Sequence, residues 1–126
     1  IERAIKSVLD QNYDNFEHII MDNCSTDGTI DILKKYPHII WKSEKDTGQS
    51  NAMNKGFELS TGDIIVYLNC DDYFEKDTFI KVNKYFNEDQ NIKILFGKPN
   101  GISLNIHAQG FIFSLGFFYF FINKNY

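Results

Sequence analysis

The stretch DIIVYLN, residues 63–69, constrains the fold most strongly. Its uninterrupted apolar run is typical of a strand covered on both faces. Shorter apolar runs at 16–22, 38–42 and 92–97 predict further strands. Apolar residues at helical spacing predict helices over 2–11, 29–36, 50–60 and 77–87. This alternation predicts an α/β fold with three layers, α/β/α, around a mainly parallel sheet.

Composition narrows the classes of ligand. The 126 residues suit one domain with a real core, and 43% hydrophobic with 24% charged residues is ordinary for a globular chain. The formal net charge is −4 and no cluster of Lys and Arg is present, so the sequence predicts no nucleic-acid partner. An acidic chain that binds an anion needs a metal ion or backbone donors to hold it.

The two cysteines, Cys24 and Cys70, each follow a predicted strand and have no CxxC spacing. They predict free thiols in a reducing, cytoplasmic compartment rather than a disulfide framework or a zinc site. The chain begins with IERAIKSVLDQ, a pattern typical of a helix already under way. We therefore expect a fragment that lacks its natural N-terminus.

An adjacent acid pair, Asp71 and Asp72, follows the strongest predicted strand, and Asp22 ends an earlier one. Ligands of parallel sheets bind beyond the carboxyl ends of the strands, so we expect these side chains at one edge. Two neighbouring carboxylates repel unless a cation neutralises them, and Mg²⁺ or Mn²⁺ does so while also binding phosphate oxygens. A solvated acidic turn is the alternative for an isolated pair.

Other polar side chains have two interpretations. Asp22 suits hydrogen bonds from a base or a ribose, or alternatively a turn cap. Asp46 lies in a loop with no evident capping role, and Asn54 in the following helix is ambiguous. Asp27 is better explained as the cap of the next helix, and Lys55 as part of a solvated face.

Several motifs together resemble one family. FEHIIMDNCSTDGT, EKDTGQSNAMNKGFELSTGDIIVYLNCDDYF and the first helix are similar, in order and spacing over residues 1–97, to family-2 glycosyltransferases of the GT-A fold. The resemblance implies a Rossmann-like nucleotide-diphospho-sugar transferase fold, a nucleotide-sugar donor and a divalent metal, Mg²⁺ or Mn²⁺. It also implies hexosyl transfer to an acceptor hydroxyl with inversion, in polysaccharide or glycoconjugate biosynthesis.

The resemblance also assigns roles by position. Asp22, with Asn23, would contact the base or ribose, and Asp46 would line the nucleoside pocket. Asp71 and Asp72 take the place of the family's DXD-like motif, with Asp72 the better candidate for direct metal contact. The predicted donor-binding set is Asp22, Asn23, Asp46, Asn54, Asp71 and Asp72.

Partners and location follow from the same resemblance. The donor would be a UDP-, GDP- or dTDP-type sugar, and the acceptor a saccharide or a lipid-linked saccharide. The expected location is the cytoplasm, with peripheral attachment to the inner face of the membrane as an alternative. That attachment would use residues 111–122, which hold seven aromatics in twelve residues and are too few to span a bilayer. A buried or interfacial segment and a truncated or out-of-frame tail are the other interpretations.

The sequence departs from the family pattern at both ends. The family's first strand is missing before residue 1, which predicts an unpaired position near the centre of the sheet. No Asp or Glu follows Asp89, so the general base that takes the acceptor's proton is unknown, and His107 is the one conventional candidate in the tail. We therefore expect a donor-binding domain at 1–98, a replaced or truncated acceptor region at 99–126, and no transfer by this chain alone.

Two further hypotheses remain, one weaker than the glycosyltransferase interpretation and one closely related to it. A signalling receiver domain would also place acids at strand ends and a Lys-Pro pair such as Lys98–Pro99, but 27 positions after Asp71 are too few for the intervening elements. A non-catalytic remnant that binds nucleotide without turnover differs from an active enzyme only at the missing ends.

Overall fold

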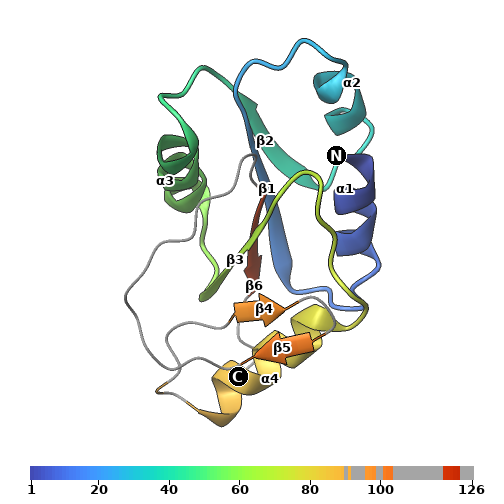
Figure 1. Cartoon of the computed structure of the whole chain (residues 1–126), viewed down its shortest axis with the longest axis vertical. Helices are drawn as coiled ribbons and strands as arrows, with labels where there is room; N and C mark the ends of the chain where they lie inside the picture. Colours follow the sequence, from blue (N-terminus) through green and yellow to red (C-terminus); the bar gives the residue numbers. More distant parts are fainter. Residues whose placement is uncertain (90, 92–95, 99–100, 104–117, 123–126) are drawn as a thin grey trace.

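The computed structural model describes residues 1–89, 91, 96–98, 101–103 and 118–122 (Figure 1). The helices and strands alternate through residue 88, as the sequence predicts. In chain order they are α1 Glu2–Leu9, β1 Phe16–Asp22, α2 Thr29–Leu33, β2 Ile39–Ser43, α3 Gln49–Leu59, β3 Ile64–Leu68, α4 Thr78–Glu88, β4 Phe96–Lys98, β5 Gly101–Ser103 and β6 Phe118–Ile122.

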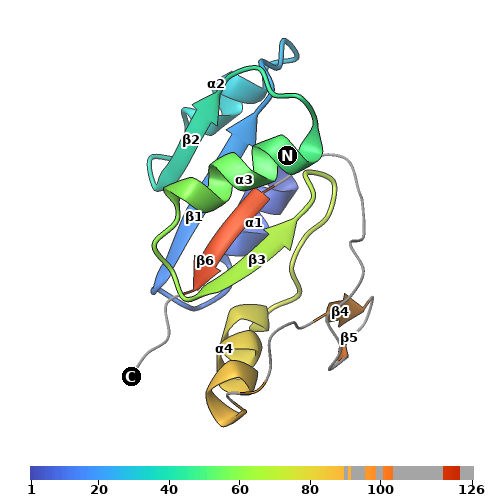
Figure 2. The ribbon, with the colours of Figure 1, turned by 90° about the vertical axis from the view of Figure 1, so that its left-hand side faces the viewer.

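The main sheet has four strands in the order β2-β1-β6-β3. Strand β1 pairs with β2 in parallel, whereas β6 pairs antiparallel with both β1 and β3. Strands β1, β2 and β3 therefore run in the same direction, and Figure 2 shows their arrowheads at the same end of the sheet. This arrangement confirms an α/β fold with parallel strands, consistent with a Rossmann-like GT-A fold.

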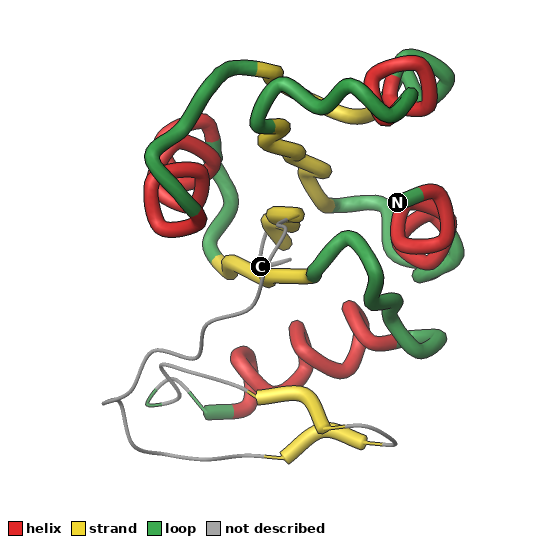
Figure 3. Tube along the Cα trace, turned by 45° about the horizontal axis from the view of Figure 1, so that its top comes forward, coloured by secondary structure: helices red, strands yellow, loops and turns green. Residues whose placement is uncertain are grey.

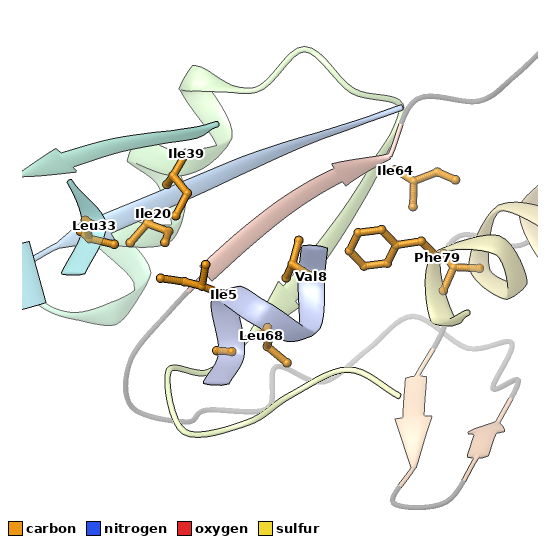
Figure 4. Close-up of a cluster of buried hydrophobic side chains, with 10 residues drawn as sticks. Ile5, Val8, Ile20, Leu33, Ile39, Ile64, Leu68 and Phe79 are labelled. Atoms are coloured by element: carbon orange, nitrogen blue, oxygen red, sulfur yellow. The ribbon is translucent and has the colours of Figure 1, made fainter. Parts of the chain in front are cut away.

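Helices cover both faces of the sheet (Figure 3). One hydrophobic cluster joins α1, α2 and α4 to one face, and its largest members include Ile5, Leu33 and Phe79 (Figure 4). A second cluster joins Ala52 of α3 to Ile19 and Met21 on the opposite face. Successive residues of β1 thus point alternately into two cores, which explains why Ile19, Ile20 and Met21 are all apolar.

The C-terminal strand β6 corrects one expectation. The position between β1 and β3, which we predicted to be unpaired, is occupied by β6. Residues Phe16–Ile20 pair with 118–122 on one side, and Ile64–Leu68 pair with them on the other. Part of the segment after residue 98 thus belongs to the main sheet, while the predicted boundary between 98 and 99 stays a prediction.

Strands β4 and β5 form a separate antiparallel pair. Residues 96 and 97 of the predicted strand 92–97 belong to β4, outside the main sheet, and residues 92–95 lie outside the described part of the chain. Residues 111–117 of the aromatic tail lie outside it as well. Among the helices that the structure describes, none has the length and apolar character needed to cross a membrane.

The end of α2 and the start of α4 differ in detail from what the sequence predicts. Helix α2 ends at Leu33, before Pro37, because the amides of Lys35 and Tyr36 bond to carbonyls three residues back and tighten the last turn. Asp77 is the N-cap residue of α4, as predicted, but it has a left-handed backbone with φ of 61° and makes no side-chain capping bond.

Candidate functional site

The carboxyl ends of β1, β2 and β3 present three polar loops at one edge of the sheet (Figure 2). The loop after β1 starts at Asn23, the loop after β2 at Glu44, and the loop after β3 at Asn69. Because β6 separates β1 from β3, their ends lie two strand spacings, about 10 Å, apart. All of the predicted donor-binding residues belong to this edge or to α3, which follows the second loop.

Asp22 lies at the end of β1 and is 7% exposed. Its Oδ2 accepts hydrogen bonds from the Ser25 amide at 3.0 Å and from the Ser43 hydroxyl at 2.5 Å. Burial raises the pKa of the Asp22 carboxyl, but the bonds from Ser25 and Ser43 outweigh burial and leave the pKa below its usual value. Asp22 is therefore an ionised carboxylate that holds the ends of β1 and β2 together, which is the turn-capping role weighed as the alternative to donor contact.

Asn23 and Asp46 join the first two loops directly. The Oδ1 atom of Asn23 accepts a hydrogen bond from the Asp46 amide at 3.1 Å. Asp46 has a local role that the sequence did not indicate, since its Oδ1 accepts from the amide of Gly48 at 2.8 Å. Gly48 is the N-cap residue of α3 and has a φ of 119°, a backbone conformation that residues other than glycine rarely adopt.

Lys55 ties α3 to the loop after β2. Its Nζ lies 2.6 Å from Glu44 Oε1 and donates to the Lys45 carbonyl at 3.1 Å. Lys42 contacts the other oxygen of Glu44 at 2.8 Å, and these two lysines lower the pKa of that carboxyl. The prediction that Lys55 lies on a simple solvated face is therefore wrong. Asn54, next to it, is exposed on α3.

The acid pair stands on an exposed turn after β3. Asp71 and Asp72 are both exposed, and the Asp72 amide donates to the Asn69 carbonyl at 3.2 Å. The Asn69 side-chain amide donates to Asp72 Oδ2 at 2.8 Å. Asn69 therefore holds Asp72 through two bonds, one to its backbone amide and one to its carboxylate.

The acid pair fits an open metal site rather than an all-protein cage. Within the described residues, no group of three or more His, Cys, Asp or Glu side chains is placed to hold a metal ion. Mg²⁺ and Mn²⁺ prefer oxygen ligands, and Mg²⁺ is usually bound by one or two carboxylates together with substrate phosphates and water. Two exposed carboxylates, those of Asp71 and Asp72, would match that protein share.

Several smaller predictions can also be placed. Gly28 is the N-cap residue of α2, and Asp27 just before it accepts bonds from the Thr29 amide at 3.1 Å and the Thr29 hydroxyl at 2.6 Å. Cys24 and Cys70 are free, exposed thiols. His107 lies outside the described residues.

Three residues in α1 or just after its end, near the acid pair, escaped the sequence analysis. Arg3, Ser7 and Gln11 contact the loop that follows Asp72, and an open groove of about 800 Å³ lies between this loop and α1. The sequence held a clue to Gln11. It lies three positions after Val8 and so continues the apolar face of the helix, yet its side chain is polar. It is 1% exposed.

Comparisons with known proteins place the chain in one family. The model of the family described as Glycosyl transferase family 2 matches residues 1–124. The chain is 38% identical over 94 residues to TuaG of Bacillus subtilis, whose name assigns it to teichuronic acid biosynthesis as a glycosyltransferase. It is 30% identical over 113 residues to a PGL/p-HBAD biosynthesis glycosyltransferase of Mycobacterium tuberculosis, and 40% identical over 91 residues to an uncharacterized glycosyltransferase of Rickettsia conorii.

The coverage of these matches is uneven. They include 70%, 85% and 70% of this chain, respectively, but only 37%, 44% and 15% of the three relatives. The chain therefore spans less than half the length of each. No solved structure gave a significant match. On the family match, which extends over nearly the whole sequence, the chain belongs to glycosyltransferase family 2.

Proposed function

We propose that this chain forms the donor-binding part of a glycosyltransferase that transfers a hexosyl group from a nucleotide-diphosphate sugar to an acceptor hydroxyl, with inversion at the anomeric carbon. The observation that carries the proposal is the placement of Asp71 and Asp72 at the same sheet edge as Asp22 and the joined loops of Asn23 and Asp46. A nucleoside diphosphate is long enough to extend along this edge.

In this arrangement, each group has a distinct task. The loops of Asp22, Asn23 and Asp46, with Asn54 beside them, bind the nucleoside. Asp72, with Asp71 next to it, binds the diphosphate through Mg²⁺ or Mn²⁺, as is general in the family. Such an ion would neutralise the negative charge that develops on the leaving nucleotide. The hydrogen bond from Asn69 to Asp72 Oδ2 keeps that carboxylate oriented before the donor arrives.

The proposed partners are a UDP-, GDP- or dTDP-sugar and a saccharide or lipid-linked acceptor. The names of the Bacillus and Mycobacterium relatives support a role in polysaccharide or glycoconjugate biosynthesis. We propose that the protein works in the cytoplasm, with attachment to the inner face of the membrane through residues 111–122 as an alternative. Residues 1–98 would form the donor-binding domain.

We further propose that this chain alone binds its donor without completing transfer. The support is that no Asp or Glu follows Asp89 in the sequence. A positioned base contributes about 10²–10⁴-fold to such a reaction. A nucleotide-binding remnant without any catalytic role is the second candidate, and it predicts the same binding.

The test is a panel of nucleotide sugars with Mn²⁺ and several saccharide acceptors. We expect donors to raise the midpoint of thermal unfolding, since a ligand at 100 times its Kd stabilises the folded state by about 2.7 kcal/mol. Nucleotide release should be slow and independent of acceptor. Acceptor-dependent product over many turnovers would contradict the inactivity of the chain, and no stabilisation by any donor would contradict the proposed function.

A further inference from the structure

The loop that carries the acid pair lies alongside α1 (Figure 1). This loop, residues 69–77, leaves the carboxyl end of β3 and reaches α4 at Thr78. Its stretch from Tyr73 onward is held by side chains of α1 and of Gln11 just after it, whereas Asn69 and Asp72 bond to each other within the turn. The acid pair therefore stands on a short turn between two fixed points.

The contacts come from one side of α1 and from the turn that follows it. Arg3 and Ser7 are four residues apart on α1, so they lie on the same side of the helix. Gln11 follows two residues after the helix ends, and its amide donates to the Val8 carbonyl at 3.1 Å. The guanidinium carbon of Arg3 lies 3.7 Å from the centroid of the Tyr73 ring. The Ser7 hydroxyl oxygen accepts a hydrogen bond from the Phe74 amide at 3.0 Å.

Gln11 is the most deeply buried of the three residues. Its Nε2 donates to the Glu75 carbonyl at 3.0 Å, and its Oε1 accepts from the Phe79 amide at 3.2 Å. The same Nε2 also donates to the Ser7 carbonyl at 2.8 Å, so both ends of the amide are used. A side chain that is 1% exposed and bonded at both ends fixes the backbone that it contacts, because breaking any of these bonds would leave a buried polar group unsatisfied.

The same stretch is also anchored in the core. The Phe74 ring packs edge-on against Phe79, with centroids 5.2 Å apart, and Phe79 is fully buried. At the other end of the turn, Leu68 is 7% exposed at the end of β3. Only Asn69, Cys70 and the two acids lie between Leu68 and Tyr73, so few backbone torsions remain by which the carboxylates can move.

The geometry points to Arg3, Ser7 and Gln11 as positioning residues that fix the place of the Asp71–Asp72 carboxylates for a metal-bound diphosphate. This inference rests on the proposed function of the acid pair. The three residues touch neither acid, and they act by holding the backbone directly after Asp72. Outer groups that orient metal ligands typically change metal affinity by about 10–100-fold when they are removed.

The test compares Ser7→Ala and Gln11→Leu with the wild-type chain. Each protein is titrated with UDP, GDP and dTDP in Mn²⁺ and again in EDTA, at a temperature where urea melts show all of them folded. We expect the metal-dependent gain in affinity to fall about tenfold in both variants. Affinity in EDTA should stay unchanged, because the nucleoside loops after β1 and β2 are not altered.

The matched control is Ile39→Val, which removes one methyl group from the core at the start of β2, far from the acid pair. It should lose stability without losing metal dependence. If Gln11→Leu does not fold, Ser7→Ala alone decides the question. An unchanged metal-dependent gain in folded Ser7→Ala, or an equal loss in Ile39→Val, would overturn the inference while leaving the proposed function intact. A wild-type chain without metal-dependent binding would overturn both.

Discussion

The side chain of Asn23 accepts a hydrogen bond from the backbone amide of Asp46 at 3.1 Å, and this bond joins the loops that follow two neighbouring strands. The two residues are 23 positions apart, and both come from the predicted donor-binding set. The bond gives a structural reason for Asn23 to matter whether or not its side chain touches the donor.

Replacing Asn23 by Ala should therefore weaken nucleotide binding with little effect on folding. Asn23 is exposed, so its truncation opens no cavity. A hydrogen bond contributes about 1 kcal/mol, which corresponds to about a five-fold loss of affinity if the loop is displaced by that amount. Isothermal titration with the best-binding nucleoside diphosphate measures this loss. Asn23→Asp, which keeps the accepting oxygen, is the matched control, and equal affinity in all three proteins would show that the bond does not shape the site.

A histidine pair on the opposite half of the sheet predicts acid sensitivity. His18 Nδ1 and His38 Nε2 lie 3.1 Å apart, so one ring donates and the other accepts only if the pair is not fully protonated. Burial, and secondarily His38, lowers the pKa of His18 to about 3, and burial also lowers the pKa of His38. Unfolded histidines have a pKa of about 6.5, so between pH 6.5 and pH 3 the unfolded chain binds more protons.

The free energy of unfolding should consequently be highest above pH 6.5 and should fall as the pH is lowered. For His18, the fall approaches about 1.4 kcal/mol per pH unit, or about 2 kcal/mol between pH 6.5 and pH 5. Urea melts from pH 7.5 to pH 5 measure it, above the range in which carboxylates titrate. His18→Phe should reduce the slope, and His38→Gln provides a second variant if the first fails to fold. A slope unaffected by either change would refute the assignment.

Strand β6 should be needed for the sheet to remain closed. Removing residues 118–126 leaves unpaired, along five residues each, β3 and the edge of β1 that faces away from β2, and unpaired strand edges promote association. We expect a lower urea midpoint and aggregates in light scattering. Removal of 123–126 alone is the control and should have little effect. If the chain without residues 118–126 is monomeric and has the same urea midpoint as the intact 126-residue chain, β6 contributes little to stability.

The sequence predicted local structure well and long-range pairing poorly. Strand β1 matches its predicted bounds because a run such as FEHIIMD, followed by turn residues, has few alternative structures. The place of β6 could not be predicted, because which strands pair across about 100 residues is not encoded in periodicity. The antiparallel direction of β6 is also contrary to the simple rule that alternating strands and helices give parallel neighbours.

The candidate site shows the same difference between local features, which the sequence predicts, and long-range contacts, which it does not. The acids at strand ends could be found, because strand ends are visible in the sequence and ligands of parallel sheets bind beyond them. The support beneath them could not, because Gln11 contacts residues 64 and 68 positions away. Lys55 gained its partner for the same reason, since Glu44 becomes its neighbour only once the loop after β2 folds against α3. The bond from the Gly48 amide to Asp46 spans only two positions and is a local contact.

The most direct test of the central claim is the affinity of the chain for UDP, GDP and dTDP in Mn²⁺ and in EDTA, measured by isothermal titration for the wild type, Asp72→Asn and Asp14→Asn. Asp14 is an exposed carboxylate before the amino end of β1, at the opposite edge of the sheet, and serves as the matched control. We predict tighter binding in Mn²⁺ for the wild type and for Asp14→Asn, and loss of most of that difference in Asp72→Asn. Equal affinity in Mn²⁺ and EDTA for the wild type, or an undiminished difference in Asp72→Asn, would contradict a metal-bound diphosphate at the acid pair.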